Sequence, residues 1–136
     1  MISKAIYSLL ANNTSITDLV GTKIYKNVRE QKAGLPAITY QVISGVRGHD
    51  LTGPNGLLEG RIQINCFSDS ANDPLGAVEL AAVVRAALNG HRGGAAGVHI
   101  ETMLLDDQSD LPYIDPEDEA QNVEAEMMDF YVLYKE

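Results

Sequence analysis

Two stretches of strictly alternating residues, separated by a loop rich in glycine and proline, constrain the fold of this chain more than any other feature. They are "AITYQVISG" (37–45) and "GRIQINCF" (60–67), and between them lies "TGPNG" (52–56). The apolar positions are Ile38, Tyr40 and Val42 in the first stretch and Ile62, Ile64 and Cys66 in the second. Because side chains alternate between the two faces of a strand, the pattern predicts a long antiparallel hairpin with one buried and one wet face.

The N-terminal segment has the spacing of an amphipathic helix, with Ile2, Ile6 and Leu10 on one face. It ends at Asn12-Asn13, and a short helical turn follows that Gly21 stops. We expect a short strand in "KIYKNV" before the hairpin begins.

The segment "NDPLGAVELAAVVRAALNG" is the strongest helix signal in the chain. Asp73 can cap it, Pro74 suits the first helical position, and Asn89-Gly90 provides the stop. Its main apolar stripe comprises Ala77, Leu80, Ala81, Val84, Ala87 and Leu88. The further apolar residues Val78, Ala82 and Ala86 predict that this helix is covered on more than one side.

Two more strands are predicted in "VHIETMLLDD" and "VEAEMMDFYVLY", separated by a long acidic loop that contains two prolines. The chain has 136 residues, a length typical of one domain. The resulting order predicts an α+β fold over residues 1–136: a single domain with a mostly antiparallel sheet, a long β-hairpin and helices packed on the sheet.

The composition restricts the classes of function. The single cysteine, Cys66, allows no internal disulfide, and no apolar run approaches a secretory or membrane-spanning segment, so we expect a soluble protein made in a reducing cytoplasm. The net charge is −9, and residues 93–134 contain eleven acids without a lysine or arginine. This acidity disfavours sequence-specific binding of DNA or RNA.

No arrangement of residues indicates catalysis, a cofactor or a metal. Neither "TGPNG" nor "NGHRGGAAGV" opens a helix, so both are better explained as turns than as phosphate-binding loops. His49-Asp50 lacks the further ligands of a metal-dependent phosphohydrolase, and Cys66 alternates with core residues. We therefore expect no catalytic, cofactor-binding or metal-binding residues.

The acidic loop partly fits a calcium-binding register. Asp106, Gln108, Asp110 and Glu117 occupy positions 1, 3, 5 and 12 of an EF-hand-like loop. Leu111 stands where glycine is needed, two prolines interrupt the loop, and a strand precedes it instead of a helix. These departures disfavour a dedicated calcium site and leave open only a weak, adventitious one.

The order of the segments resembles the tail completion, or tail terminator, family of long-tailed bacteriophages and prophages. The matching segments are "LVGTKIY", "LPAITYQVISG", "LTGPNGL", "RIQINCFS", "VRAALNGHRG", "LLDDQSDL" and "MMDFYVLY". The resemblance extends over nearly the whole chain, and the combination of "GPNGL", "RIQINC" and the later "LDD" is its most specific part.

This resemblance implies a non-enzymatic structural protein of the virion. Family members cap the growing tail tube, stop its polymerisation and join it to the head connector, acting as homo-oligomeric, typically hexameric rings. The implied partners are further copies of the chain, the tail tube protein and the head-tail connector proteins, and the genome passes through the ring without sequence-specific binding. The implied location is the head-proximal end of the tail, after synthesis in the bacterial host cytoplasm, with no membrane involved.

A ring would explain the uneven charge, since a closed ring joins different faces of neighbouring copies. The basic residues of this hypothetical interface are Lys23, Lys26, Arg29 and Lys32, and the acidic ones are Asp115, Glu117, Asp118 and Glu119. The hairpin loop is expected to contact a neighbouring copy or the tail tube through His49, Asp50, Leu51, Thr52, Pro54 and Asn55.

Two alternatives remain open from the sequence. The first is another head-tail connector or minor tail component of similar size, which would be found on portal complexes rather than on tail tubes. The second is a small soluble binding module that uses His49 and the acidic loop to hold a cation; stabilisation by metal ions would favour it.

Overall fold

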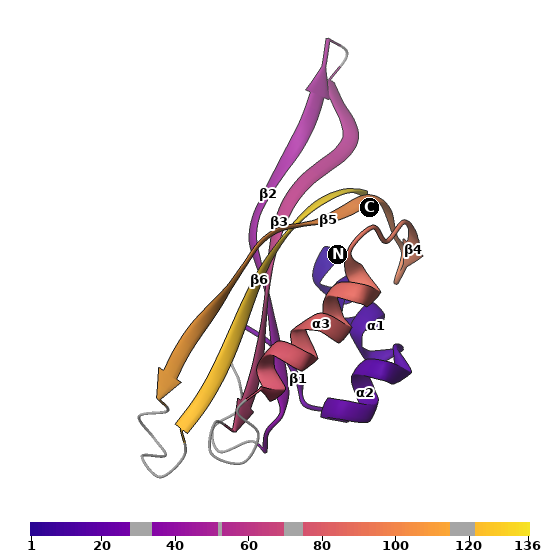
Figure 1. Cartoon of the computed structure of the whole chain (residues 1–136). Coiled ribbons are helices and arrows are strands. Elements are labelled where there is room, and N and C mark those ends of the chain that lie inside the picture. The colour runs from indigo at the N-terminus through magenta and orange to yellow at the C-terminus, as the bar shows by residue number, and fades with distance from the viewer. Residues whose placement is uncertain (28–33, 52, 70–74, 115–121) are drawn as a thin grey trace.

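The computed structural model describes residues 1–27, 34–51, 53–69, 75–114 and 122–136 (Figure 1). Its elements are α1 (Ile2–Ala11), α2 (Thr14–Val20), β1 (Ile24–Lys26), β2 (Ala37–Asp50), β3 (Gly53–Asp69), α3 (Gly76–Leu88), β4 (Gly93–Ala95), β5 (Val98–Ile114) and β6 (Asn122–Lys135). The described strands form one six-stranded sheet in the order β1-β2-β3-β6-β5-β4. The sheet is strongly twisted, and the helices pack on one of its faces (Figure 1). The predicted α+β class is confirmed.

The first two helices form as their sequence predicts. Ile6 and Leu10 of α1 are completely buried, so the predicted apolar face is the one that packs on the sheet. The side chain of Asn13 caps α2 by accepting a hydrogen bond from the Ile16 N–H at 3.2 Å. Gly21, at φ 61°, then ends α2 in a conformation that disfavours a side chain.

Strands β2 and β3 form the predicted antiparallel hairpin. Ile38 pairs with Cys66 and Tyr40 with Ile64, and all four side chains face the helices and are buried. The opposite face is less wet than predicted: Thr39 is only 2% exposed, and its hydroxyl accepts a hydrogen bond from the Asn65 amide at 3.2 Å. Strand β1 adds to β2 in the parallel direction, so the sheet is mostly rather than entirely antiparallel.

The centre of the core is formed by β3 and β6. Met128, Phe130 and Val132 alternate on β6, are completely buried and lie beneath α1 and α3. Burial of such side chains contributes roughly 1.5–3 kcal/mol each to stability.

Strand β5 corrects one prediction. The acidic segment was expected to be a loop from Asp106 onward, but β5 continues to Ile114 and pairs with β6 through to Asn122. Pairing with a buried central strand supplies backbone hydrogen bonds that outweigh the weak strand propensity of aspartate. A further strand, β4, was predicted only as a turn, and Ala96 and Gly97, both at positive φ, connect it to β5.

Helix α3 begins at Gly76, with Leu75 as its N-cap and no side-chain cap; the predicted cap Asp73 and Pro74 lie outside the described residues. Its main apolar stripe packs on β3 and β6 as predicted. The second apolar side was expected to be covered, yet Val78 is 44% exposed and Ala82 and Ala86 are also exposed. The described part of this chain therefore covers α3 on one side only.

In the described part of the chain, no helix is long and apolar enough to cross a membrane.

Candidate functional site: the hairpin arm and the ends of the sheet

The end of the β2–β3 hairpin projects well beyond the body of the molecule (Figure 1). We call residues 43–60 the hairpin arm. Asp50 pairs with Gly53, so the chain reverses between these two residues. The tip was predicted over Thr52–Gly56; the turn is tighter because Gly53 to Gly56 are already part of β3. Glycines at φ 120° and 80° in this segment allow a strongly twisted ribbon.

A close contact anchors the arm where it leaves the body. Gly45 of β2 pairs with Gly60 of β3, and the ring of Tyr134 from β6 lies against both. A Cβ atom at Gly60 would come within 3.1 Å of the Ser44 carbonyl oxygen and 3.3 Å of Tyr134 Cε1. Tyr134 itself is 3% exposed, and burial is the main cause that raises the pKa of its hydroxyl. The missing side chain at Gly60 thus lets β6 hold the base of the arm.

The arm exposes apolar side chains that the described chain does not cover. Ile43 is 46% exposed, Val46 is 62% exposed and Leu51 is fully exposed. Register shifts between Val42 and Ser44, and again between Arg47 and His49, mark bulges that bend the strand. A rigid projecting ribbon with uncovered apolar residues is suited to contact another protein.

The structure brings together only part of the predicted interface. His49 pairs with Pro54 and lies beside Asp50 and Asn55 in the backbone of the arm. Lys23 precedes β1 and Lys26 is its last residue, and both lie at the opposite end of β2 from the tip. The remaining predicted residues lie outside the described part of the chain: Arg29, Lys32, Thr52, Asp115, Glu117, Asp118 and Glu119.

Two polar contacts on the sheet were not predicted. Arg61 Nη1 lies 2.6 Å from Asp106 Oδ2, an exposed ion pair that joins β3 to β5. Glu126 on β6 is only 5% exposed and accepts a hydrogen bond from Gln108. The sequence held a signal for Glu126, since it has the same strand parity as Met128 and Phe130 and must face the helices.

The titratable groups of the described residues are dispersed or held in structural contacts. They contain no cluster of three or more histidine, cysteine, aspartate or glutamate residues that could hold a metal ion. The EF-hand-like register fails because Asp106, Gln108 and Asp110 lie on a strand, with Asp106 bound to Arg61 and Gln108 to Glu126. Complete burial raises the pKa of the Cys66 thiol far above its ordinary value, as expected for a core cysteine.

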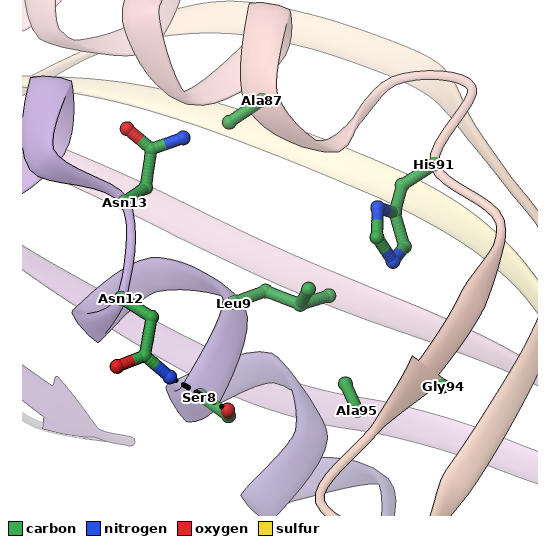
Figure 2. Close-up of a pocket in the computed structure, with 8 residues that line it drawn as sticks. All are labelled: Ser8, Leu9, Asn12, Asn13, Ala87, His91, Gly94 and Ala95. Atoms are coloured by element: carbon green, nitrogen blue, oxygen red, sulfur yellow. Dashed lines mark hydrogen bonds between the residues drawn. The ribbon is translucent and has the colours of Figure 1, made fainter.

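An open cleft of about 360 Å³ lies between the ends of α1 and α3 and strand β4 (Figure 2). Its polar side chains have structural roles: Asn12 donates a 3.0 Å hydrogen bond to Ser8, and Asn13 caps α2. His91 points into the space between the helices and β4, and its Nε2 is buried without a hydrogen-bond partner in the described structure. None of the lining residues pairs a nucleophile with a base.

Comparison with known proteins shows the family to which the chain belongs. No curated protein matches the chain. The family model described as Tail completion protein gp17 matches residues 4–125. The chain belongs to this tail completion family. It is therefore a structural protein of a bacteriophage-type tail, as the resemblance in the sequence implied.

Solved structures share the fold of this tail completion protein. A chain from the "Virion of native gene transfer agent (GTA) particle" is 17% identical with a TM-score of 0.75, covering 97% of this chain and 92% of its own. A second solved chain is 14% identical with a TM-score of 0.58, covering 96% of this chain and 92% of its own. Nearly the whole length of the tail completion protein is therefore aligned with these two folds.

Proposed function

We propose that this tail completion protein ends the tail tube at its head-proximal end. In this proposal it assembles as a closed homo-oligomeric ring, a hexamer, which stops tube growth and forms part of the joint to the head connector. The genome passes through the ring without sequence-specific contacts. The protein works by binding alone and is made in the host cytoplasm before it joins the virion. Family membership and the fold shared with a gene transfer agent virion protein support this role.

The observation that carries the proposal is the hairpin arm with its uncovered apolar residues. Covering an exposed Val46 or Leu51 in a contact yields roughly 25 cal/mol for each Å² of apolar surface removed from water. The arm is held by two paired strands and by Tyr134, so little conformational freedom is lost when it binds. These properties suit an element that contacts a neighbouring copy or the last ring of the tube.

The proposal is tested by assembling phage particles without the protein and measuring tail length by electron microscopy. We expect tails of abnormal length that do not join to heads, and restoration of both by the wild-type protein. Tails of normal length that lack only head attachment would identify a connector component instead and contradict the role in termination.

A second part of the experiment uses a variant with a shortened hairpin. Removal of His49–Asn55 leaves Gly48, Gly56 and Leu57 between the paired residues Arg47 and Leu58, and a three-residue loop that contains glycine is compatible with a tight hairpin. We expect this variant to fold with an unchanged midpoint of unfolding but to fail in restoring tail length. A Glu79→Gln substitution on the exposed side of α3 serves as the control and should restore tail length fully.

A further inference from the structure

Opposite charges lie at the two ends of the single sheet. At the β1–β2 end, Lys23 precedes β1, Lys26 is the last residue of β1, and Arg47 lies exposed on β2. At the β5 end, Asp107 and Asp110 are exposed on the strand. Since β1 and β2 are separated from β5 by β3 and β6, these charges cannot satisfy one another within one copy.

Both ends of the sheet also have free strand edges in the described part of the chain. Strand β1 covers β2 only as far as Tyr40, so the outer edge from Gln41 to Asp50 has no strand beside it. Strand β4 covers β5 at Val98–Ile100, and the Gly90 N–H and Asn89 side chain bind the β5 backbone at residues 103 and 105. Among the described residues, no strand lies beside the outer edge of β5 from Asp107 to Ile114.

The strand directions allow the free edges of β2 and β5 to pair with each other in neighbouring copies. Strands β2, β3, β6 and β5 are neighbours in this order, and each adjacent pair is antiparallel. Strands β2 and β5 therefore run in opposite directions. In a closed ring every copy has the same orientation relative to the axis, so β2 of one copy meets β5 of the next in an antiparallel arrangement.

We propose that the β2 edge Gln41–Asp50 of one copy pairs with the β5 edge Asp107–Ile114 of the next, so that the sheet continues from copy to copy. This inference rests on the proposed ring and names the surfaces that join it. In this pairing Arg47 comes level with the Asp107–Asp110 segment of the neighbour and shares the face of the sheet with Asp110, while Asp107 points to the opposite face. Lys23 and Lys26 lie toward the end of the neighbour's β5.

The registers within one copy determine how such copies are offset. Tyr40 is level with Gln108 across the sheet, through the pairs with Ile64 and Met128. From this level the free edge of β2 extends toward the hairpin tip, whereas the free edge of β5 extends in the opposite direction. Joining the two free edges therefore displaces each copy along the strand direction relative to the last. Strands that close into a barrel show the same stagger, which accompanies their tilt.

Both edges carry features that limit indiscriminate pairing. Strand β2 has two register shifts, and β5 contains Pro112, which has no N–H to donate. Only a partner strand whose bends and charges match those of the edge can pair with it. This makes a second copy of the chain a better occupant than an unrelated strand, because the complementary charges belong to the same molecule.

Charge exchange tests the pairing. One variant carries Lys26→Glu with Arg47→Glu, and the other carries Asp107→Lys with Asp110→Lys. We expect each alone to form rings at least about tenfold more weakly, since like charges now face each other, and we expect an equimolar mixture to restore rings in which the variants alternate. Ring formation is measured by native mass spectrometry and electron microscopy, in solution and on purified tail tubes.

Lys4→Glu with Asp18→Lys, on the helices, provides the matched control and should leave ring formation unchanged. Thermal unfolding of each variant monomer confirms that the fold is intact. If both exchanged variants form rings as well as the wild type, the edge pairing is wrong although the ring stands. If the wild type forms no ring, even on tail tubes, the proposed function itself is wrong.

Hydrogen exchange gives a second, independent measurement. Pairing of backbones should slow exchange of the amides in 41–50 and 107–114 that face away from β3 and β6 by at least about tenfold in the ring relative to the monomer, because strand hydrogen bonds protect them. A contact made by side chains alone would leave these amides unprotected and would overturn the inference.

Discussion

The side-chain amide of Gln108 donates a 2.9 Å hydrogen bond to the carboxylate of Glu126, which is almost completely buried. The carbonyl oxygen of the same amide accepts a 2.7 Å hydrogen bond from Arg85 on α3. Gln108 therefore separates a cation and an anion that do not meet directly. Burial, followed by the neighbouring Asp110, raises the pKa of Glu126, and the bond from Gln108 lowers it only in part.

This raised pKa predicts an unusual contribution to the pH dependence of stability. The folded protein holds the Glu126 proton more tightly than the unfolded chain, whose pKa is near 4.5. The stabilisation is therefore complete below that value and is lost as the pH rises through the raised pKa of the folded state. We expect Glu126→Gln to be more stable than the wild type at pH 8 and to lose this advantage by pH 4.

Urea denaturation at a series of pH values measures the effect as the difference in free energy of unfolding between the two proteins. Gln108→Leu removes the donor that partly lowers the Glu126 pKa, so its stability should fall more steeply with pH than that of the wild type. Parallel curves for the wild type and Glu126→Gln from pH 4 to 8 would contradict the assignment.

The base of the arm predicts unequal effects at two paired glycines. At Gly60→Ala the new Cβ meets the Ser44 carbonyl oxygen at 3.1 Å, so we expect a loss of roughly 1–3 kcal/mol in the free energy of unfolding. At Gly45→Ala the nearest atom, the Tyr134 hydroxyl, is 3.7 Å away, so the change should stay within about 0.5 kcal/mol. Equal losses at both positions, measured by chemical denaturation, would disprove this account of the contact with Tyr134.

The exposed and buried apolar residues of the arm should separate assembly from stability. Val46→Ser should change the free energy of unfolding by less than about 0.5 kcal/mol while reducing incorporation into particles. Leu58→Ala, at a position only 5% exposed, should cost roughly 2–5 kcal/mol. The prediction for Val46 is wrong if its serine variant is incorporated as efficiently as the wild type.

The thiol of Cys66 should report unfolding. It is completely buried, and burial raises its pKa, so the reactive thiolate is scarce in the folded protein. We expect alkylating reagents to modify Cys66 on the timescale of global unfolding, with at least about a hundredfold acceleration in denaturant. Rapid modification in native buffer, detected by mass spectrometry, would show that the core opens locally at β3.

The sequence predicted the elements in which side-chain periodicity and burial agree. The alternation in 37–45 and 60–67 defined the hairpin, and the spacing of Ile6 and Leu10 defined α1, because one face of each element is buried. The sequence also identified the hairpin tip as a candidate contact surface, although the turn lies earlier than predicted.

Elements that depend on their neighbours escaped prediction. The second half of β5 consists of aspartate, serine and proline among few apolar residues, and its strand structure comes from pairing with β6. The three residues of β4 include two glycines and have no periodicity to detect. The basic and acidic ends of the sheet required knowledge of strand order, which places β2 and β5 at opposite sides although they are the first and third long strands along the chain.

The antiparallel alternation of the four long strands has a consequence for the number of copies. A sheet that starts with one direction and ends with the other can be extended by identical copies without limit, as a strip. Whether such a strip closes after few or many copies, or spirals into a filament, depends on the rotation between successive copies. In this protein the twist of the sheet and the bulges of β2 would set that rotation. The diameter of the ring would therefore depend on the curvature of the backbone rather than on the charges at the contact.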